Sequence, residues 1–148
     1  MNNEVILLKT SELSLKVINK INILKNSHWT HGLKSQNIWF KNNIKKDDMH
    51  IIIKNSNIII GYNCIRKFNF RGKNNYLFDT FIITNKYRNK GLSKLIMQKN
   101  IEFYKNKRLP FILFCNNKLI KFYERFGWEK TDYKKSLINK KNLLIFKA

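Results

Sequence analysis

The sequence is poor in cysteine, proline and glycine, with two, one and five of them among 148 residues. So few cysteines exclude a disulfide framework and a four-cysteine zinc site. Cys64 and Cys115 lie in apolar segments and are therefore expected to be buried thiols. No run approaches the ~18 apolar residues that a membrane helix needs, and the first residues do not resemble a signal peptide. We therefore expect a cytoplasmic protein without a membrane segment.

Acidic residues are also scarce. Nine Asp and Glu accompany thirty Lys and Arg, which gives a formal net charge of +21. Such an excess is typical of proteins that bind RNA or another polyanion. The basic residues are scattered, however, and Lys, Asn and Ile are enriched together, as in proteins encoded by AT-rich genes. Three explanations of the positive charge are open: codon bias, an anionic substrate or cofactor, and a nucleic-acid partner. No recognised nucleic-acid motif supports the last.

The chain has the length of one domain, which we expect to span residues 1–148. Alternating and helical hydrophobic patterns predict a series of strands and helices. The predicted strands cover residues 5–8, 49–54, 58–70, 76–83, 111–115, 133–137 and 143–146, and the last two are expected to form a closing hairpin. The predicted helices cover residues 13–24, preceded by a cap and acidic first turn at Thr10, Ser11 and Glu12, and residues 38–44, 91–105 and 116–126. Residues 25–36 lose the helical periodicity and are expected to form a loop.

The segment after the strand 76–83 has the features of a diphosphate site. Arg88, Lys90 and Gly91 lie in a short loop that opens directly into a helix. Helix starts carry unpaired N–H groups and the positive end of the helix dipole, and both favour an anion. Gly91 allows close approach of the backbone, and the two basic side chains add charge. Alone, a basic loop before a helix is a weak signal.

A second segment strengthens this interpretation. Residues 116–128 read NNKLIKFYERFGW. They resemble the Asn-x-x-Ala-x-x-Phe-Tyr-x-x-x-Gly-Phe signature of the GCN5-related N-acetyltransferase (GNAT) family, with Leu119 at the usual alanine. Arg88, Gly91 and Ser93 resemble that family's cofactor motif, Arg/Gln-x-x-Gly-x-Gly/Ala. The two motifs stand in the family's order, and the resemblance covers residues 49–128 well.

This resemblance implies an α/β (α+β) fold with a mixed, mostly antiparallel sheet of six or seven strands and about four helices. It also implies acetyl-coenzyme A as the acyl donor and no metal. Pantetheine would pair with the main chain of Phe81, Ile82 and Ile83, where two parallel strands separate in the family. The diphosphate would be held by amides of the loop and helix start, with Arg88 beside them. These amides belong to Asn89, Lys90, Gly91, Leu92 and Ser93.

Three further residues match functional positions of the family. Tyr123 matches the tyrosine that protonates the coenzyme A thiolate, a role that suits a phenol with a pKa near 10; a plain core aromatic is the alternative. Asn116 would touch pantetheine or cap the following helix. Asp79 is the only carboxylate in an apolar strand. It would accept the amine's proton or anchor the acceptor, unless it points outward and pairs with a nearby lysine.

The acceptor site is expected near the first two helices, where Trp29, His31 and Trp39 occur. The histidines lack the spacing of a metal site. The segment 48–79 also resembles aminoglycoside 2′-N-acetyltransferases and nodulation acyltransferases, which favours a primary amine of a small molecule, such as an amino sugar. The positive charge favours a nucleotide-linked or otherwise anionic amino sugar. A basic RNA- or ribosome-binding protein and a non-catalytic coenzyme A-binding protein are the alternatives, and a homodimer is left open.

Overall fold

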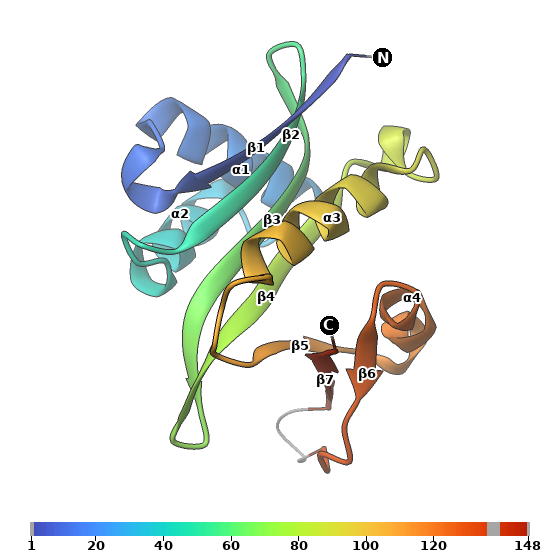
Figure 1. Ribbon diagram of the computed structural model, residues 1–148. Helices are drawn as coiled ribbons and strands as arrows, with labels where there is room; N and C mark the ends of the chain where they lie inside the picture. Colours follow the sequence, from blue (N-terminus) through green and yellow to red (C-terminus); the bar gives the residue numbers. More distant parts are fainter. Residues whose placement is uncertain (1, 136–139, 148) are drawn as a thin grey trace. The chain divides into compact units, whose positions relative to one another are not determined.

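The computed structural model describes residues 2–135 and 140–147 (Figure 1). Its described residues form seven strands and four α-helices in a mixed α+β fold. The strands are β1 (Asn3–Lys9), β2 (Met49–Asn55), β3 (Ile58–Phe70), β4 (Lys73–Ile83), β5 (Phe111–Cys115), β6 (Trp128–Lys130) and β7 (Asn142–Phe146). The helices are α1 (Leu15–His28), α2 (Leu33–Asn43), α3 (Leu92–Tyr104) and α4 (Ile120–Glu124). The hydrogen-bonded strand order is β1-β2-β3-β4-β5-β7-β6. The expected fold class is confirmed.

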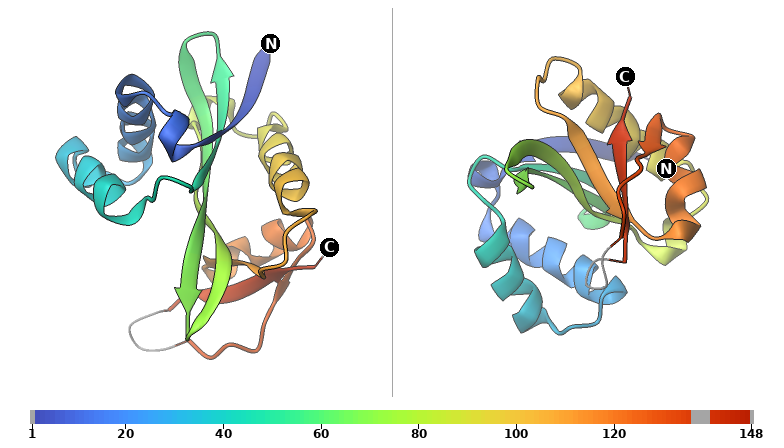
Figure 2. Two further views of the ribbon diagram at one scale, coloured as in Figure 1. Left: turned by 60° about the vertical axis from the view of Figure 1, so that its left-hand side comes forward. Right: turned by 90° about the horizontal axis from the view of Figure 1, so that it is seen from below.

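The chain divides into two compact units. The first contains residues 1–66 and 79–102, and the second contains residues 67–78 and 103–148. Strands β3 and β4 contribute residues to both units. Within the first unit, α1 and α2 cover one face of the strands and α3 covers the other (Figure 2).

The first helix begins and ends later than its sequence pattern predicts. Ser14 is its N-cap, and the Ser14 hydroxyl accepts a hydrogen bond from the Val17 N–H at 3.2 Å. The predicted cap and first turn at Thr10, Ser11 and Glu12 are therefore wrong, because Thr10–Glu12 forms a separate 3-10 turn. The predicted loop 25–36 is also wrong: α1 continues to His28 and α2 already begins at Leu33. Polar side chains on the continuing turns hid the helical period from sequence inspection.

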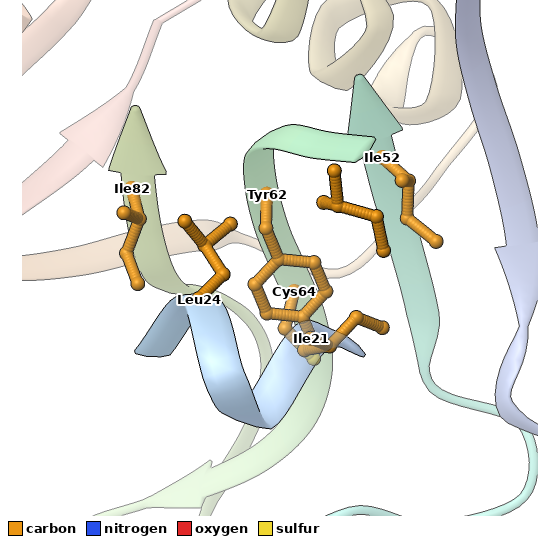
Figure 3. Close-up of a cluster of buried hydrophobic side chains, with 7 residues drawn as sticks. Ile21, Leu24, Ile52, Tyr62, Cys64 and Ile82 are labelled. Carbon is orange, nitrogen blue, oxygen red and sulfur yellow. The ribbon is translucent and has the colours of Figure 1, made fainter. Parts of the chain in front are cut away.

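The middle strands form an antiparallel meander whose core is aliphatic. Strand β2 pairs with β1 and β3, and β3 connects to β4 through the two-residue turn of Arg71 and Gly72, whose φ angles are 51° and 76°. The buried cluster under α1 is shown in Figure 3. It contains Ile21, Leu24, Ile52, Ile59, Tyr62, Cys64 and Ile82. Cys64 is therefore buried, as expected.

The second unit has a short sheet and an aromatic core. Strand β4 pairs with β5 in parallel, with Tyr76 beside Phe111 and Leu77 beside Ile112. Strand β7 pairs antiparallel with β5 and β6. The predicted strand 133–137 is wrong for residues 133–135, and residues 136–137 lie outside the described residues. The partner of β7 is instead β6, which starts at Trp128 immediately after Gly127.

Two further expectations concern burial and membrane contact. Cys115 is buried at the end of β5, as expected. Within residues 2–135 and 140–147, none of the helices combines the length and apolar character that crossing a membrane requires.

Candidate functional site

The loop between β4 and α3 has the backbone conformation of an anion site. A 3-10 turn, Asn85–Tyr87, follows β4. Asn89 and Gly91 then adopt left-handed backbone angles, with φ of 60° and 77°. A side chain at Gly91 would meet no atom within 4 Å, so the glycine is required by its backbone angle rather than by crowding. The chain thus turns sharply just before the start of α3.

The main-chain N–H groups of this turn are available to a ligand. Among the described residues, none accepts a hydrogen bond from the N–H groups of residues 89–93. The first N–H of the helix with a partner is that of Lys94, which donates to the Gly91 carbonyl at 3.1 Å. These donors lie at the positive end of the α3 dipole, where anions are favoured. Five consecutive residues can therefore offer N–H groups to phosphate oxygens.

Arg88 connects this loop to the end of β4. Its Nε donates to the Ile83 carbonyl at 3.0 Å, and its Nη2 lies 3.3 Å from Nδ1 of His28 at the end of α1. The side chain is exposed, so its charge remains accessible from solvent. The arginine therefore holds the loop in place and adds a positive charge beside its amides.

Strand β4 is kinked where its only carboxylate occurs. Thr80 has a φ of 53°, which is rare for a β-branched residue and typically costs about 1–3 kcal/mol. The Asp79 Oδ1 accepts the Thr80 N–H at 2.8 Å. The Asp79 Oδ2 accepts both Nε and Nη2 of Arg66 at 2.8 Å. The carboxylate is thus paired, with an arginine rather than with a lysine.

Two buried asparagines fix the main chain at this kink. The Asn63 side-chain amide on β3 donates to the Asp79 carbonyl at 2.9 Å. The Asn100 side-chain amide on α3 donates to the Asn63 Oδ1, also at 2.9 Å. Asn63 and Asn100 are 0% and 2% exposed. A continuous amide chain therefore joins α3, β3 and the kink in β4.

A buried cation accompanies the Arg66–Asp79 pair. Lys25 on α1 is only 4% exposed, and its ammonium nitrogen lies 3.9 Å from the centre of the Trp39 ring. The Arg66 guanidinium lies 5.4 Å from the same ring. Burial lowers the pKa of Lys25 to about 8, although the nearby Asp79 charge acts in the opposite direction. Trp39 is thus flanked by two basic groups.

The other residues expected in the acceptor site lie where α1 ends. Trp29 is the half-buried C-cap of α1, and its ring packs edge-on against His28 at 4.7 Å. His31 is exposed in the connection to α2, with its N–H bonded to the Trp29 carbonyl. A small hollow of about 140 Å³ adjoins this region, and its walls include His28, Ile82, Ile83 and Arg88. Ile82 and Ile83 are buried and Phe81 is partly exposed.

Tyr123 and Asn116 belong to the second unit. Tyr123 is 6% exposed on α4, and its ring packs edge-on against Phe78 at 5.8 Å. Burial raises the pKa of this phenol, and the adjacent Cys115 thiol acts in the same direction. Asn116 is exposed at the start of the 3-10 turn Asn117–Leu119, and its side chain forms no capping hydrogen bond.

The predicted site residues therefore fall into two sets. The first unit contains the loop, Asp79, Trp39 and the end of α1; its printed contacts join the loop to the end of α1 through Arg88, and Asp79 to Trp39 through Arg66. The second unit contains Asn116 and Tyr123. Sequence reasoning missed the first-unit polar residues Lys25, Asn63, Arg66 and Asn100. A polar residue within the apolar run of β3 was the available signal for Asn63, whereas Lys25 resembled the many surface lysines. Among the described residues, no group of three potential metal ligands occurs.

Comparison with known proteins identifies the fold and the family. The model of the acetyltransferase (GNAT) family matches residues 17–128. An acyl-CoA N-acyltransferase from Pseudomonas aeruginosa superposes with a TM-score of 0.79 at 12% identity, over 99% of this chain and 100% of that one. The paia N-acetyltransferase of Thermoplasma acidophilum, in complex with coenzyme A, superposes with a TM-score of 0.69 at 13% identity over the whole of both chains. The Tetrahymena GCN5 histone acetyltransferase domain, also with coenzyme A, gives 0.68 at 14% identity, over 97% of this chain and 92% of that one.

A search of curated protein sequences finds no significant match. The family match spans most of the chain and includes both motifs, the basic loop and the segment around Tyr123. The protein therefore belongs to the acetyltransferase (GNAT) family of acyltransferases.

Proposed function

We propose that this protein is a single-domain enzyme, residues 1–148, that transfers an acetyl group from acetyl-coenzyme A to a primary amine of a small molecule. The observation that carries the proposal is the loop before α3, where residues 89–93 offer unpaired N–H groups beside two left-handed residues. Paired phosphates are the ligand class that this arrangement suits. The Thermoplasma relative forms a complex with coenzyme A, which supports the same choice.

The residues present fit the cofactor. Amides of Asn89, Lys90, Gly91, Leu92 and Ser93 would hold the diphosphate, with Arg88 and Lys90 supplying charge. The main chain of Phe81, Ile82 and Ile83 and the side chain of Asn116 would hold pantetheine. Acetyl-coenzyme A supplies a thioester whose carbonyl carbon is open to an amine. A strand N–H near Phe81 or Ile82 would stabilise negative charge on the carbonyl oxygen.

Tyr123 would act as the proton donor. Attack by a neutral amine forms the new C–N bond, and the C–S bond breaks to release a thiolate, which needs a proton. Burial raises the pKa of the Tyr123 phenol, so the group is protonated at neutral pH and able to donate. The proton lost by the amine would pass to water or to an acidic group.

Asp79 is better suited to anchoring the acceptor than to accepting its proton. Both of its oxygens already accept hydrogen bonds, one from Thr80 and the other from Arg66. A carboxylate with these partners has fewer free lone pairs for an incoming proton. Trp29, His31 and Trp39 would complete the acceptor site. The basic groups at Trp39 favour an anionic acceptor, such as a nucleotide-linked amino sugar, over a polycation.

The cofactor proposal is tested by thermal unfolding with acetyl-coenzyme A. Ligand at 100 times its dissociation constant adds about 2.7 kcal/mol to the free energy of unfolding. Gly91→Ala is expected to weaken this binding because it strains the turn. Gly72→Ala is a matched control, since Gly72 has a φ of 76° and also has no atom within 4 Å of an added side chain. Absence of a shift at millimolar cofactor, or equal binding by both variants and wild type, would contradict the proposal.

The acceptor is tested by measuring coenzyme A release with a panel of anionic, neutral and cationic amines. Turnover is expected to be highest with anionic amino sugars and to fall in Tyr123→Phe. Turnover restricted to polycations would overturn the acceptor class while leaving the cofactor assignment intact. Cofactor binding without turnover on any amine, together with unchanged behaviour of Tyr123→Phe, would favour a coenzyme A-binding protein without catalysis.

A basic RNA-binding protein remains the second candidate, favoured by the net charge of +21. RNA binding that collapses with added salt, in a protein that shows no stabilisation by acetyl-coenzyme A, would support it.

A further inference from the structure

A larger hollow lies in the first unit, between the middle of α1 and the tip of the β2–β3 hairpin. Its volume is about 350 Å³, within the roughly 300–1,000 Å³ range of small-molecule sites. Leu24, Ile59 and Ile60 line it and are at most 7% exposed. Ile23 and Ile58 also line it and are 53% and 64% exposed. The hollow therefore has an aliphatic surface that remains open to solvent.

Among the described residues that line this hollow, the one charged residue is Lys20, beside the neutral polar residues Ser27, Asn57 and Thr84. Lys20 is part of the wall, and its ammonium donates to the Asn57 carbonyl at 2.8 Å. Tyr87 forms another part of the wall. The ammonium nitrogens of Lys86 and Lys90 lie 5.8 Å and 5.4 Å from the centre of the Tyr87 ring. No carboxylate occurs among the described residues that line the hollow. The charge of the rim is thus complementary to an anion.

The hollow is separate from the proposed catalytic residues. It contains neither Asp79 nor any residue of the loop 89–93. It shares Ser27 and Thr84 with the small hollow beside Ile83 and Arg88. An occupant would therefore lie next to the end of β4 and the 3-10 turn without contacting the diphosphate amides.

We propose that this hollow binds an amphipathic anion with one aliphatic chain, of the class of medium-chain fatty acids. The chain would lie on the isoleucines of α1 and the hairpin, and the carboxylate would face Lys20. Aliphatic walls favour a flexible chain over a stacked ring, because only Tyr87 supplies an aromatic surface. This site does not depend on the acetyltransferase function.

The direct test is isothermal titration calorimetry with hexanoate, octanoate and decanoate, each kept below its aggregation concentration. Every added methylene is expected to raise affinity roughly fourfold while the chain still fits the hollow. Decyltrimethylammonium has the same chain with the opposite charge and is expected to bind at least tenfold more weakly than decanoate. Equal binding of the two, absence of any chain-length dependence, or no binding at millimolar decanoate would each overturn the proposal.

Two pairs of variants on α1 locate the site. Ile23→Asp and Lys20→Glu are expected to weaken decanoate binding at least tenfold. Leu15→Asp and Lys16→Glu make the same changes at exposed positions of the same helix that do not line the hollow, and less than a twofold change is expected. Equal effects of the two pairs would instead mean general attraction to a basic surface. Binding of decanoate should persist in Gly91→Ala, which separates this site from the cofactor site.

Discussion

The two units of this protein are stabilised in different ways. The first buries a charged or titratable set, Lys25, Asp48 and His50, and the amides Asn22, Gln36, Asn63 and Asn100, among isoleucines. The second buries Phe78, Phe111, Tyr123, Trp128 and Phe146. Among the described residues of this unit, the buried polar ones are the uncharged Asn75 and Asn142. The first unit therefore has a core that responds to pH, and the second has a core that depends on ring packing.

The difference corresponds to the structural feature that each set of contacts holds in place. Hydrogen-bonded groups in the first unit hold the kink of β4, where Asn63 binds the Asp79 carbonyl and Arg66 binds its carboxylate. Buried polar groups of this kind contribute specificity of conformation at a cost in desolvation. Ring contacts in the second unit fix α4 and its tyrosine by shape and area. The kinked main chain at Asp79 and Thr80 is held by hydrogen bonds. The Tyr123 ring is held mainly by packing against other rings.

The largest expected effect is the loss of one ring from the second core. Phe111 is 1% exposed and contacts the rings of Trp128 at 4.9 Å and Tyr104 at 5.2 Å. Phe111→Ala should reduce the free energy of unfolding by about 3–5 kcal/mol, measured by urea denaturation. Leu119→Ala, at a position that is 41% exposed in the same unit, is the control and should cost less than about 1 kcal/mol. Similar losses in both variants would mean that the ring packing is not the main support of this unit.

The next effect is the acid sensitivity of the first unit. Burial, assisted by the charge of Lys25, lowers the pKa of His50 to about 4 from its ordinary 6.5. Its ring is held between the Thr10 hydroxyl at 2.7 Å and the Tyr62 hydroxyl at 2.8 Å. The unfolded chain therefore binds this proton more readily, and stability present above pH 6.5 is lost as the pH falls toward 4. The loss should be about 3 kcal/mol at most.

Urea denaturation between pH 7 and pH 4 measures this loss. His50→Gln should remove about 3 kcal/mol of the pH dependence, while His31→Gln, at an exposed position, should retain it. An unchanged acid slope in His50→Gln would place the sensitivity of the first unit elsewhere.

The titration of Lys25 should also make the stability of the first unit rise with pH, in the alkaline range. Its pKa is about 8 in the folded protein and 10.5 ordinarily, mainly because of burial. The unfolded chain binds this proton more readily between these values, so stability should rise as the pH increases from 8 to 10.5. The gain should be about 2 kcal/mol, because attraction to the Trp39 ring offsets part of the burial cost. Lys25→Met should lose this gain and Lys16→Met should keep it; the same gain in both would contradict the assignment.

The sequence allowed the strand order of the meander and both family motifs to be predicted, because β-branched runs and short polar turns are local signals. The last turn of α1, residues 25–28, was missed, because Lys25, Asn26 and His28 are polar on a turn that tertiary contacts nevertheless stabilise. The pairing of β7 with β6 was missed, because Trp128–Lys130 is only three residues long. In the candidate site, the N–H groups of residues 89–93 could be predicted, because a basic loop with a glycine directly before a helix is a local sequence pattern. The ion pair of Arg66 with Asp79 joins residues on two strands, so only the fold brings them together.

The smallest expected change in the free energy of unfolding compares Ser14, whose side chain caps α1, with Asn116, whose side chain caps no N–H. Ser14→Ala removes a side-chain cap of α1 in the first unit and should cost about 1 kcal/mol in urea denaturation. Asn116→Ala should cost less than about 0.5 kcal/mol, because the Asn116 side chain caps no N–H and is exposed. Since Asn116 then has no measurable part in folding, a raised KM for acetyl-coenzyme A in Asn116→Ala would report contact with the cofactor itself. If stability falls as much as in Ser14→Ala while the KM stays constant, Asn116 supports the turn and should be removed from the proposed pantetheine contacts.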